Sequence, residues 1–328
     1  MIILGIESTA HTLGVGIIKA IVNNSDNSEH CEVLSNEYQQ YTSPNTGMKP
    51  DDIKEHHNKY AEHILRKSLE TAKIEWKDID AIAYSAGPGI DPILWIGYHK
   101  ALDWSKTYSK PLIPVNHCCA HLSIGKIINQ AKDPAYLYVS GVNTQVIVQD
   151  GGKYRIMGET LDIGLGNMLD KLGRILGLGF PAGPDVEKLA KTQTSSNFIE
   201  LPYTVKGMDI SFSGLLTKCQ QLFEQGKATK KQICYSVQET AFAACCEVAE
   251  RAMAATKKDE LILVGGVGAN KRFCQMLETM CKERNAKFFK VPMSLAGDQG
   301  AMIAWEGFKR KNNHPKMDVN CRWRTDEV

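Results

Sequence analysis

The chain has 328 residues, of which 43% are hydrophobic and 23% charged, and its formal net charge at pH 7 is +2. This is the composition of a globular protein with room for two domains, and the net charge alone does not argue for nucleic-acid binding. No apolar run is long enough to span a membrane, and the ten cysteines include no Cys-x-x-Cys, which argues against a structural zinc ribbon. We therefore expect a cytoplasmic protein with reduced thiols and no membrane partner.

The first 21 residues form two apolar, β-type runs on either side of a short polar turn at 7–10. This pattern predicts a hairpin whose tip offers backbone N–H groups and hydroxyls, which suit phosphate oxygens as well as an ordinary turn. Residues 22–52 are polar and turn-rich, and they predict two loops around a short strand near 31–38.

Apolar residues at helical spacing predict a helix from Lys54 to Lys73. Three histidines, His56, His57 and His63, lie on it. A solvated or packed helix face explains these histidines as well as metal ligation does.

Residues 79–85 predict a buried strand that runs into the Gly/Pro turn 86–89 and then into a helix ending near Tyr108. Strand, glycine turn and helix together make a crossover unit of a parallel sheet. The helix N-terminus behind the turn could receive an anion, although the spacing matches neither a Walker A motif nor Gly-x-Gly-x-x-Gly.

A short strand at 111–115 precedes Asn116, a favourable N-cap, so His117 and His121 fall in the first turns of a helix. Residues four apart share one helix face, and two such imidazoles can bind one metal ion. The pair lacks the glutamate of the metalloprotease His-Glu-x-x-His pattern, and a metal site would need ligands from elsewhere in the chain.

The second half of the chain repeats the pattern of the first. Residues 135–149 are again strand, polar turn and strand, and 259–270 are a strand with a Gly-rich turn before a helix. The repetition predicts two similar α/β lobes, over 1–133 and 134–328, with a mostly helical insertion at about 158–258 in the second lobe. Ligands in such folds bind at the loops after the strands.

Asp298 lies near the start of a further predicted helix. It suits either a capping carboxylate or a third metal ligand beside the histidines. A basic cluster at 309–311 suits a solvated tail or contact with a phosphate backbone.

Strings along nearly the whole chain resemble the universal threonylcarbamoyl-adenosine transferase family in its archaeal/eukaryotic branch, the catalytic subunit of the KEOPS complex. They include Gly-Ile-Glu-Ser-Thr-Ala-His (5–11), Val-Asn-His-Cys-Cys-Ala-His (115–121), Tyr-Val-Ser-Gly-Val-Asn-Thr-Gln-Val-Ile (138–147), Lys-Gly-Met-Asp-Ile-Ser-Phe-Ser-Gly (206–214), Val-Gly-Gly-Val-Gly-Ala-Asn (264–270) and Trp-Arg-Thr-Asp-Glu-Val (323–328).

The resemblance implies two RNase-H-like lobes of the actin, sugar-kinase and heat-shock-chaperone (ASKHA) superfamily. It implies one divalent metal ion, iron or zinc, bound by His117, His121, Asp298 and, close by, Tyr138. Contacts to a nucleotide or acyl-adenylate carry over to Tyr138, Val139, Ser140, Gly141, Val142, Asp170, Gly183, Glu187 and Asn270.

The implied reaction moves threonylcarbamoyl from threonylcarbamoyl-AMP to N6 of the adenosine that follows the anticodon in ANN-decoding tRNAs. The implied partners are tRNA and the other KEOPS subunits: a small kinase, a dimerising subunit and a small accessory subunit. An exocyclic amine is a poor nucleophile, so positioning and carbonyl polarisation are the expected means of catalysis. No residue is assigned as a catalytic base or nucleophile, and Cys118 and Cys119 are interpreted as packing thiols.

Four positions depart from the family pattern: Asp91, Trp95, Val142 and Gln299. Val142 replaces a glycine, and a β-branched residue tolerates a positive φ poorly. One hypothesis is therefore a divergent member with a weakened site that depends on its partners. The alternatives are a KEOPS subunit without catalytic activity, and an ATPase or small-molecule kinase of the same superfamily.

Overall fold

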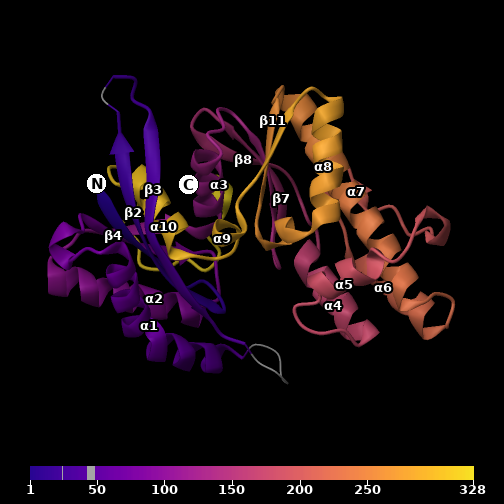
Figure 1. Cartoon of the computed structure of the whole chain (residues 1–328), viewed down its shortest axis with the longest axis horizontal. Coiled ribbons are helices and arrows are strands. Elements are labelled where there is room, and N and C mark those ends of the chain that lie inside the picture. The colour runs from indigo at the N-terminus through magenta and orange to yellow at the C-terminus, as the bar shows by residue number, and fades with distance from the viewer. Residues whose placement is uncertain (24, 43–48) are drawn as a thin grey trace. The chain divides into compact units, whose positions relative to one another are not determined.

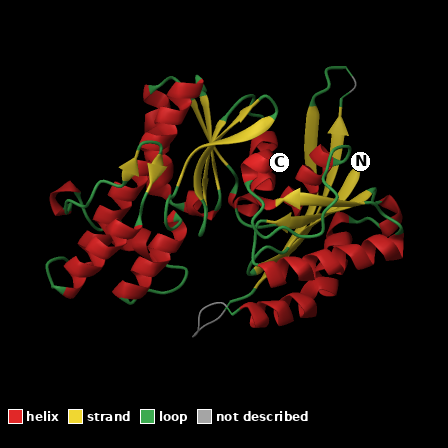
Figure 2. Ribbon diagram, turned by 180° about the vertical axis from the view of Figure 1, so that it is seen from behind, coloured by secondary structure: helices red, strands yellow, loops and turns green. Residues whose placement is uncertain are grey.

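The computed structural model describes residues 1–23, 25–42 and 49–328. The chain divides into two compact units, which Figures 1 and 2 show in front and back view. The first unit consists of Met1–Gln130 and Gly297–Val328, and the second is Ala131–Ala296. The predicted loop at 42–47 falls almost entirely outside the described residues.

The first unit is built on a five-stranded mixed sheet with the order β3-β2-β1-β4-β5. The pairs β1/β2 and β2/β3 are antiparallel, whereas β1/β4 and β4/β5 are parallel. The strands are β1 (Ile2–Glu7), β2 (Thr12–Val22), β3 (Glu29–Gln40), β4 (Ala81–Gly87) and β5 (Leu112–Asn116).

Helices pack on this sheet because alternate strand residues point to opposite faces. Leu4 and Ile6 join a hydrophobic core with Ile64 and Trp104 of the helices α1 and α2, which lie together in Figure 1. The helical segments of this unit are α1 (Pro50–Ala72), η1 (Trp76–Asp78), α2 (Asp91–Tyr108), α3 (His117–Ile128), α10 (Gly300–Arg310) and η4 (Thr325–Glu327).

Helix α10 packs on β1 and β2 at glycine positions. A Cβ at Gly5 would lie 2.2 Å from the carbonyl oxygen of Gly300, and one at Gly16 would lie 2.1 Å from the nitrogen of Ala301. Only a residue without a side chain permits this approach of helix backbone to strand backbone. Helix α10 also contacts α3, so the C-terminal segment supports the helix that carries the histidines.

The second unit repeats this topology with the order β12-β11-β6-β7-β8. Here β6/β7 and β7/β8 are antiparallel, and β6/β11 and β11/β12 are parallel. The strands are β6 (Ala135–Val139), β7 (Thr144–Asp150), β8 (Lys153–Glu159), β11 (Glu260–Val264) and β12 (Lys287–Lys290). The predicted duplication is therefore present as two sheets of the same strand order.

Helices dominate the predicted insertion, and a two-stranded sheet interrupts them. The segments of the second unit besides its large sheet are α4 (Leu165–Leu176), α5 (Gly183–Ala190), η2 (Ser195–Asn197), β9 (Val205–Lys206), β10 (Asp209–Ile210), α6 (Ser213–Glu224), α7 (Lys230–Thr256), η3 (Gly266–Ala269), α8 (Lys271–Glu283) and α9 (Met293–Ala296). Among the described residues, no helix is long and apolar enough to cross a membrane.

The division differs from the expected one at the C-terminal end of the chain. We expected 134–328 to form the second lobe, but 297–328 belong to the first unit. The physical reason is the packing of α10 on β1, β2 and α3. Sequence order alone cannot reveal this return, because it depends on which sheet face is left for α10 to cover.

Candidate functional site

Helix α3 positions His117 and His121 in its first two turns, as predicted. Asn116 is its N-cap, and the Asn116 Oδ1 accepts a hydrogen bond from the Cys119 nitrogen at 3.1 Å. The amide group of Asn116 donates to the Trp323 carbonyl at 3.1 Å, which ties the start of α3 to the C-terminal tail. The two imidazole rings lie 4.8 Å apart between centroids, and both side chains are buried.

Asp298 completes a three-residue cluster with these histidines. Its Oδ1 lies 3.3 Å from His121 Nε2 and 3.6 Å from His117 Nε2. One ligand atom from each residue lies within 4.8 Å of the others, and no second such group occurs in the described parts of the chain. The helix cap beside it is Gln299, whose side chain accepts from the Met302 nitrogen at 3.0 Å. Of the two roles that the sequence allowed for Asp298, capping of helix α10 is therefore carried out by Gln299 instead.

Burial and charge act in opposite directions on these groups. Burial lowers the pKa of His117, but the carboxylates of Glu7 and Asp298 outweigh this and raise it to about 9. Burial lowers the pKa of His121 below its usual value. Burial raises the pKa of Asp298, yet the hydrogen bond from His121 and the charge of His117 hold it well below its usual range. Asp298 is thus an ionised carboxylate between two imidazoles.

This donor set fits a divalent transition metal. Two imidazole nitrogens and one carboxylate oxygen are the ligands of many zinc and non-haem iron sites, and they leave coordination positions open. The three residues belong to the first unit. Tyr138, the fourth predicted ligand, ends β6 of the second unit, where its hydroxyl accepts from Asn143 Nδ2 at 3.4 Å. Its approach to the metal stays a prediction.

Glu7 is a site residue that the sequence interpretation missed. It ends β1 with its side chain fully buried, and its Oε2 lies 2.8 Å from His117 Nδ1. The sequence assigned Glu7 to a hairpin tip that offers donors to a phosphate. The detectable signal was a carboxylate at the end of an otherwise apolar, buried strand, a place where a charge needs a specific partner.

Several of the predicted nucleotide-binding residues lie at two strand ends of the second unit: residues 138–142 are at the end of β6 and in the turn after it, and Asn270 comes after β11 and η3. Ser140 and Asn143 close a tight turn after β6, with Ser140 N donating to the Asn143 carbonyl at 2.8 Å. The nitrogen of Asn167, in α4, donates to the Gly141 carbonyl at 2.9 Å. Gly265, which follows β11, approaches Val139 so closely that a Cβ would lie 2.3 Å from the Val139 carbonyl oxygen.

Hydrogen bonds link the remaining predicted residues around the same strand ends. Asp170 in α4 accepts from the nitrogen of Ala182, just before Gly183, at 2.8 Å. Glu187 in α5 accepts from the nitrogen of Lys271 at 3.1 Å. Asn270 precedes that lysine and caps α8. Asp170 thus lies beside Gly183, and Glu187 lies beside Asn270, while the binding of a ligand by these residues stays a prediction.

Asn270 is already engaged within the protein. Its Oδ1 accepts from the Phe273 nitrogen at 3.1 Å, and its Nδ2 donates to the buried Gln238 at 2.9 Å. One N–H of the amide remains for a ligand. Gln238 is a second residue that the sequence interpretation did not single out, since a glutamine in a helical pattern carries no recognisable signal.

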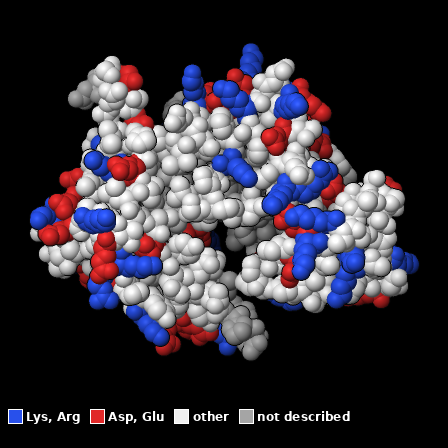
Figure 3. Space-filling model, in the orientation of Figure 1, with Lys and Arg blue, Asp and Glu red and all other residues white. Residues whose placement is uncertain are grey.

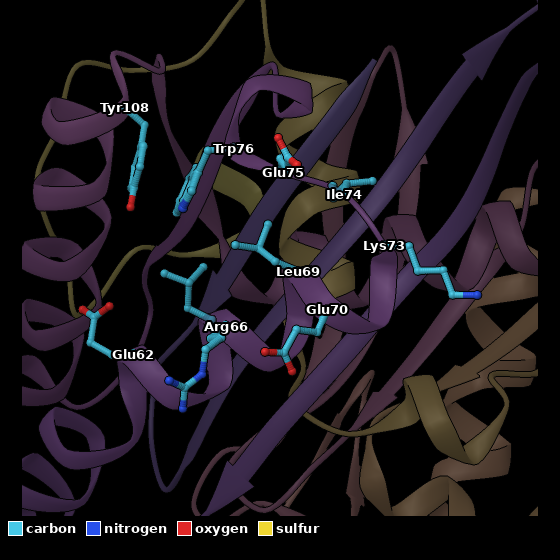
Figure 4. Close-up of a pocket in the computed structure, with 10 residues that line it drawn as sticks. Glu62, Arg66, Leu69, Glu70, Lys73, Ile74, Glu75, Trp76 and Tyr108 are labelled. Carbon is cyan, nitrogen blue, oxygen red and sulfur yellow. The ribbon is translucent and has the colours of Figure 1, made fainter.

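The histidines of α1 do not join a metal cluster of the kind found around Asp298. His57 is fully buried and its Nδ1 lies 3.2 Å from His56 Nδ1, whereas His63 is exposed. Figure 4 shows a pocket beside this helix, where Trp76 stacks on Tyr108 with ring centroids 3.8 Å apart. No predicted site residue lines that pocket.

The four departures from the family pattern have local explanations. The side chain of Val142 is 70% exposed, and its φ is not among the positive values of the described non-glycine residues. The expected backbone strain is therefore absent. Asp91 lies in the first turn of α2, where its charge is favourable, and Trp95 packs edge-on against Tyr98. Gln299 caps α10.

The fold and the cluster together define a class: an ASKHA-type α/β protein of two RNase-H-like lobes with a histidine–aspartate centre. Solved structures share the fold. HypF of T. kodakarensis superposes with a TM-score of 0.66 at 14% identity, covering 94% of this chain and 47% of that chain. The (R)-2-hydroxyglutaryl-CoA dehydratase component A of Acidaminococcus fermentans gives 0.57 at 13% identity, covering 94% and 98%.

The family follows from sequence comparison. The model of tRNA N6-adenosine threonylcarbamoyltransferase matches residues 32–305. A protein of that name from Thermococcus sibiricus is 48% identical over all of this chain and 99% of its own length. A probable bifunctional tRNA threonylcarbamoyladenosine biosynthesis protein of Methanocaldococcus jannaschii is 44% identical over all of this chain and 60% of its own length. This chain belongs to the tRNA N6-adenosine threonylcarbamoyltransferase family, and the predicted enzyme class is confirmed.

Proposed function

We propose that this chain transfers threonylcarbamoyl from threonylcarbamoyl-AMP to N6 of the adenosine after the anticodon of ANN-decoding tRNAs. The reaction depends on one divalent metal ion, iron or zinc, and takes place within a KEOPS-type complex in the cytoplasm. The observation that carries the proposal is the cluster of His117, His121 and Asp298 in a member of this family.

In this reaction the exocyclic amine attacks the carbamoyl carbon. The bond from that carbon to the phosphate oxygen breaks, AMP leaves, and N6 loses one proton. A divalent cation at His117, His121 and Asp298 would supply Lewis acidity and hold a substrate oxygen in place. The residue that takes the proton is not assigned.

The loops of the second unit are proposed to hold the acyl-adenylate. In the turn 140–143 the nitrogens of Ser140 and Asn143 donate within the turn, so the N–H groups of Gly141 and Val142 are the ones proposed for the phosphate. A Cβ built on Gly183 meets no atom within 4 Å, which leaves open space for a ligand there. Glu187 and Asn270 lie next to each other at the start of α8, where their polar atoms suit a ribose or an adenine edge. Tyr138 is proposed as a further metal contact.

Basic side chains are proposed to contact the tRNA backbone. Figure 3 shows Lys and Arg interspersed with Asp and Glu, with several basic side chains together over the helices of the second unit. Helix α8 carries Lys271, Arg272 and Lys282. Such a patch gives salt-dependent binding without sequence specificity, so recognition of the anticodon loop also calls for the proposed partner subunits.

The test reconstitutes the purified chain with its KEOPS partners, tRNA, threonylcarbamoyl-AMP and either Zn²⁺ or Fe²⁺. We expect AMP release and threonylcarbamoyl-adenosine in digested tRNA, measured by mass spectrometry. His117→Ala and Asp298→Asn should abolish both, and chelation should do the same. Full turnover by metal-free protein contradicts the metal-dependent reaction. Stoichiometric metal without turnover supports instead the subunit that has lost catalysis.

A further inference from the structure

Glu7 is a buried carboxylate whose hydrogen-bond partners are His117 of helix α3 and Thr9 of the turn that follows β1. Its Oε1 accepts from the Thr9 nitrogen at 2.8 Å and from Thr9 Oγ1 at 2.5 Å, and its Oε2 faces His117 Nδ1 at 2.8 Å. Glu7 is 0% exposed and Thr9 3% exposed. Among the ion pairs of the described residues, Glu7 pairs with a histidine and with no lysine or arginine.

Such a carboxylate is costly to bury. Removing an ionised carboxylate from water costs several kcal/mol unless hydrogen bonds and a charge partner compensate for it. The other residues of β1 are apolar, so none of them provides a partner for a charged side chain at position 7. An apolar residue at position 7 would be sufficient for packing. We therefore look for the role of the Glu7 carboxylate in its contact with His117.

The geometry defines which nitrogen of His117 is available. Because Nδ1 faces Glu7, it carries a proton that it donates to that carboxylate, and Nε2 is the nitrogen that a cation would bind in place of its own proton. Nε2 is also the atom that faces Asp298, at 3.6 Å. A carboxylate that holds the second nitrogen of a metal-binding imidazole orients the ring and increases its basicity.

We propose that Glu7 is a positioning residue for the metal centre: it accepts the Nδ1–H of His117, so that Nε2 is directed toward the cation, and Thr9 orients Glu7 in turn. This inference rests on the metal-dependent function proposed above. It joins the β1–β2 turn to α3, although the two are about 110 residues apart in sequence.

The first test measures Zn²⁺ affinity by chelator competition for wild type, Glu7→Gln and Glu260→Gln. Glu260 is the matched control, a buried carboxylate of the second unit that accepts from backbone nitrogens of Lys132 and Asp133. Glu7→Gln should weaken Zn²⁺ binding about 10- to 100-fold, while Glu260→Gln should stay within about 3-fold of wild type. Equal affinity for wild type and Glu7→Gln overturns the inference and leaves the metal centre intact. A wild type that binds no Zn²⁺ or Fe²⁺ overturns the metal centre itself.

A second test needs no substitution at Glu7. In Zn²⁺-loaded wild type with ¹⁵N-labelled histidine, we expect the His117 Nδ1 resonance of a protonated nitrogen and the Nε2 resonance of a metal-bound one. The reverse assignment overturns the inference. Thr9→Val should weaken Zn²⁺ binding and Thr9→Ser should restore it, because serine keeps the hydroxyl that donates to Glu7. A loss that serine does not restore would argue that Thr9 acts by packing alone.

Discussion

Asp298 and Gln299 are adjacent, and the sequence did not show which of them caps helix α10 and which faces the histidines. Both stand just before α10, and either could have capped it. Gln299 makes the capping hydrogen bond, so the Asp298 carboxylate is free to face His117 and His121. The side chain of Asp298 is 25% exposed, which leaves it within reach of an ion from solvent.

The two roles can be separated by substitution. Asp298→Asn should lower Zn²⁺ affinity at least about 100-fold, because it removes a charged ligand. Gln299→Ala should cost about 0.5–2 kcal/mol of unfolding free energy through the lost cap and keep one metal per chain. Metal analysis and denaturant unfolding of both variants decide the matter. A stable, metal-free Gln299→Ala protein would contradict this division.

Val142 tests whether departure from the family pattern weakens the site. Its side chain is exposed and its φ lies outside the positive region, so no strain is stored at the turn. Val142→Gly should therefore not stabilise the protein and should cost up to about 1 kcal/mol through added chain freedom. We expect turnover within about 3-fold of wild type. A large gain in turnover would instead support the weakened-site hypothesis.

At the scale of elements, α1 holds a buried histidine that is not part of the cluster of His117, His121 and Asp298. His57 is fully buried, and burial, together with the nearby His56, lowers its pKa to about 4 from the usual 6.5. In the unfolded chain His57 would titrate near 6.5. The unfolded state thus binds more protons between these two values.

The consequence is a loss of stability in acid. The contribution of neutral His57 is complete above pH 6.5 and falls as the pH drops toward 4, by roughly 3 kcal/mol in all. His57→Asn should flatten this part of the stability curve, as measured by urea unfolding at several pH values. His63→Asn, on the exposed face of the same helix, is the matched control and should leave the curve unchanged. Parallel curves for wild type and His57→Asn would contradict the assignment.

At the scale of the whole molecule, the first unit is discontinuous in sequence. Its sheet comes from the N-terminal part of the chain, whereas α10 and the C-terminal tail return from the other end. A side chain at Gly5 or Gly16 would clash with the backbone of α10, so glycine at these two strand positions is what allows the helix to pack this closely on the sheet. The second unit, by contrast, is one continuous segment.

Truncation should separate the two units. A chain of residues 1–296 lacks α10 and Asp298, so its first unit should lose cooperative folding and Zn²⁺ binding, while residues 131–296 should still fold. Heteronuclear NMR of 1–296 and of the isolated 131–296 segment should show dispersed resonances for the second unit alone. Dispersed resonances of β1 and β2 in the 1–296 protein would disagree with the structural role of α10.

Local patterns were sufficient for most elements and for the placement of His117 and His121 at the start of α3. Apolar alternation predicted the hairpins, helical spacing predicted α1, and Asn116 predicted the start of α3, because each signal arises within a few residues. The repeated strand–turn–strand pattern predicted two similar sheets, and both show the same strand order. Motifs along the whole chain indicated the family, which sequence comparison confirmed.

By itself, the sequence determined the α/β class, the duplicated lobes, the family and the histidine pair. Tertiary structure alone decided that α10 joins the first unit, that Gln299 rather than Asp298 caps it, and that Glu7 meets His117. The reason is that propensity, capping and periodicity act over a few residues, whereas the packing of α10 on β1, the contact of Asp298 with His121 and the contact of Glu7 with His117 join residues more than 100 positions apart in the chain.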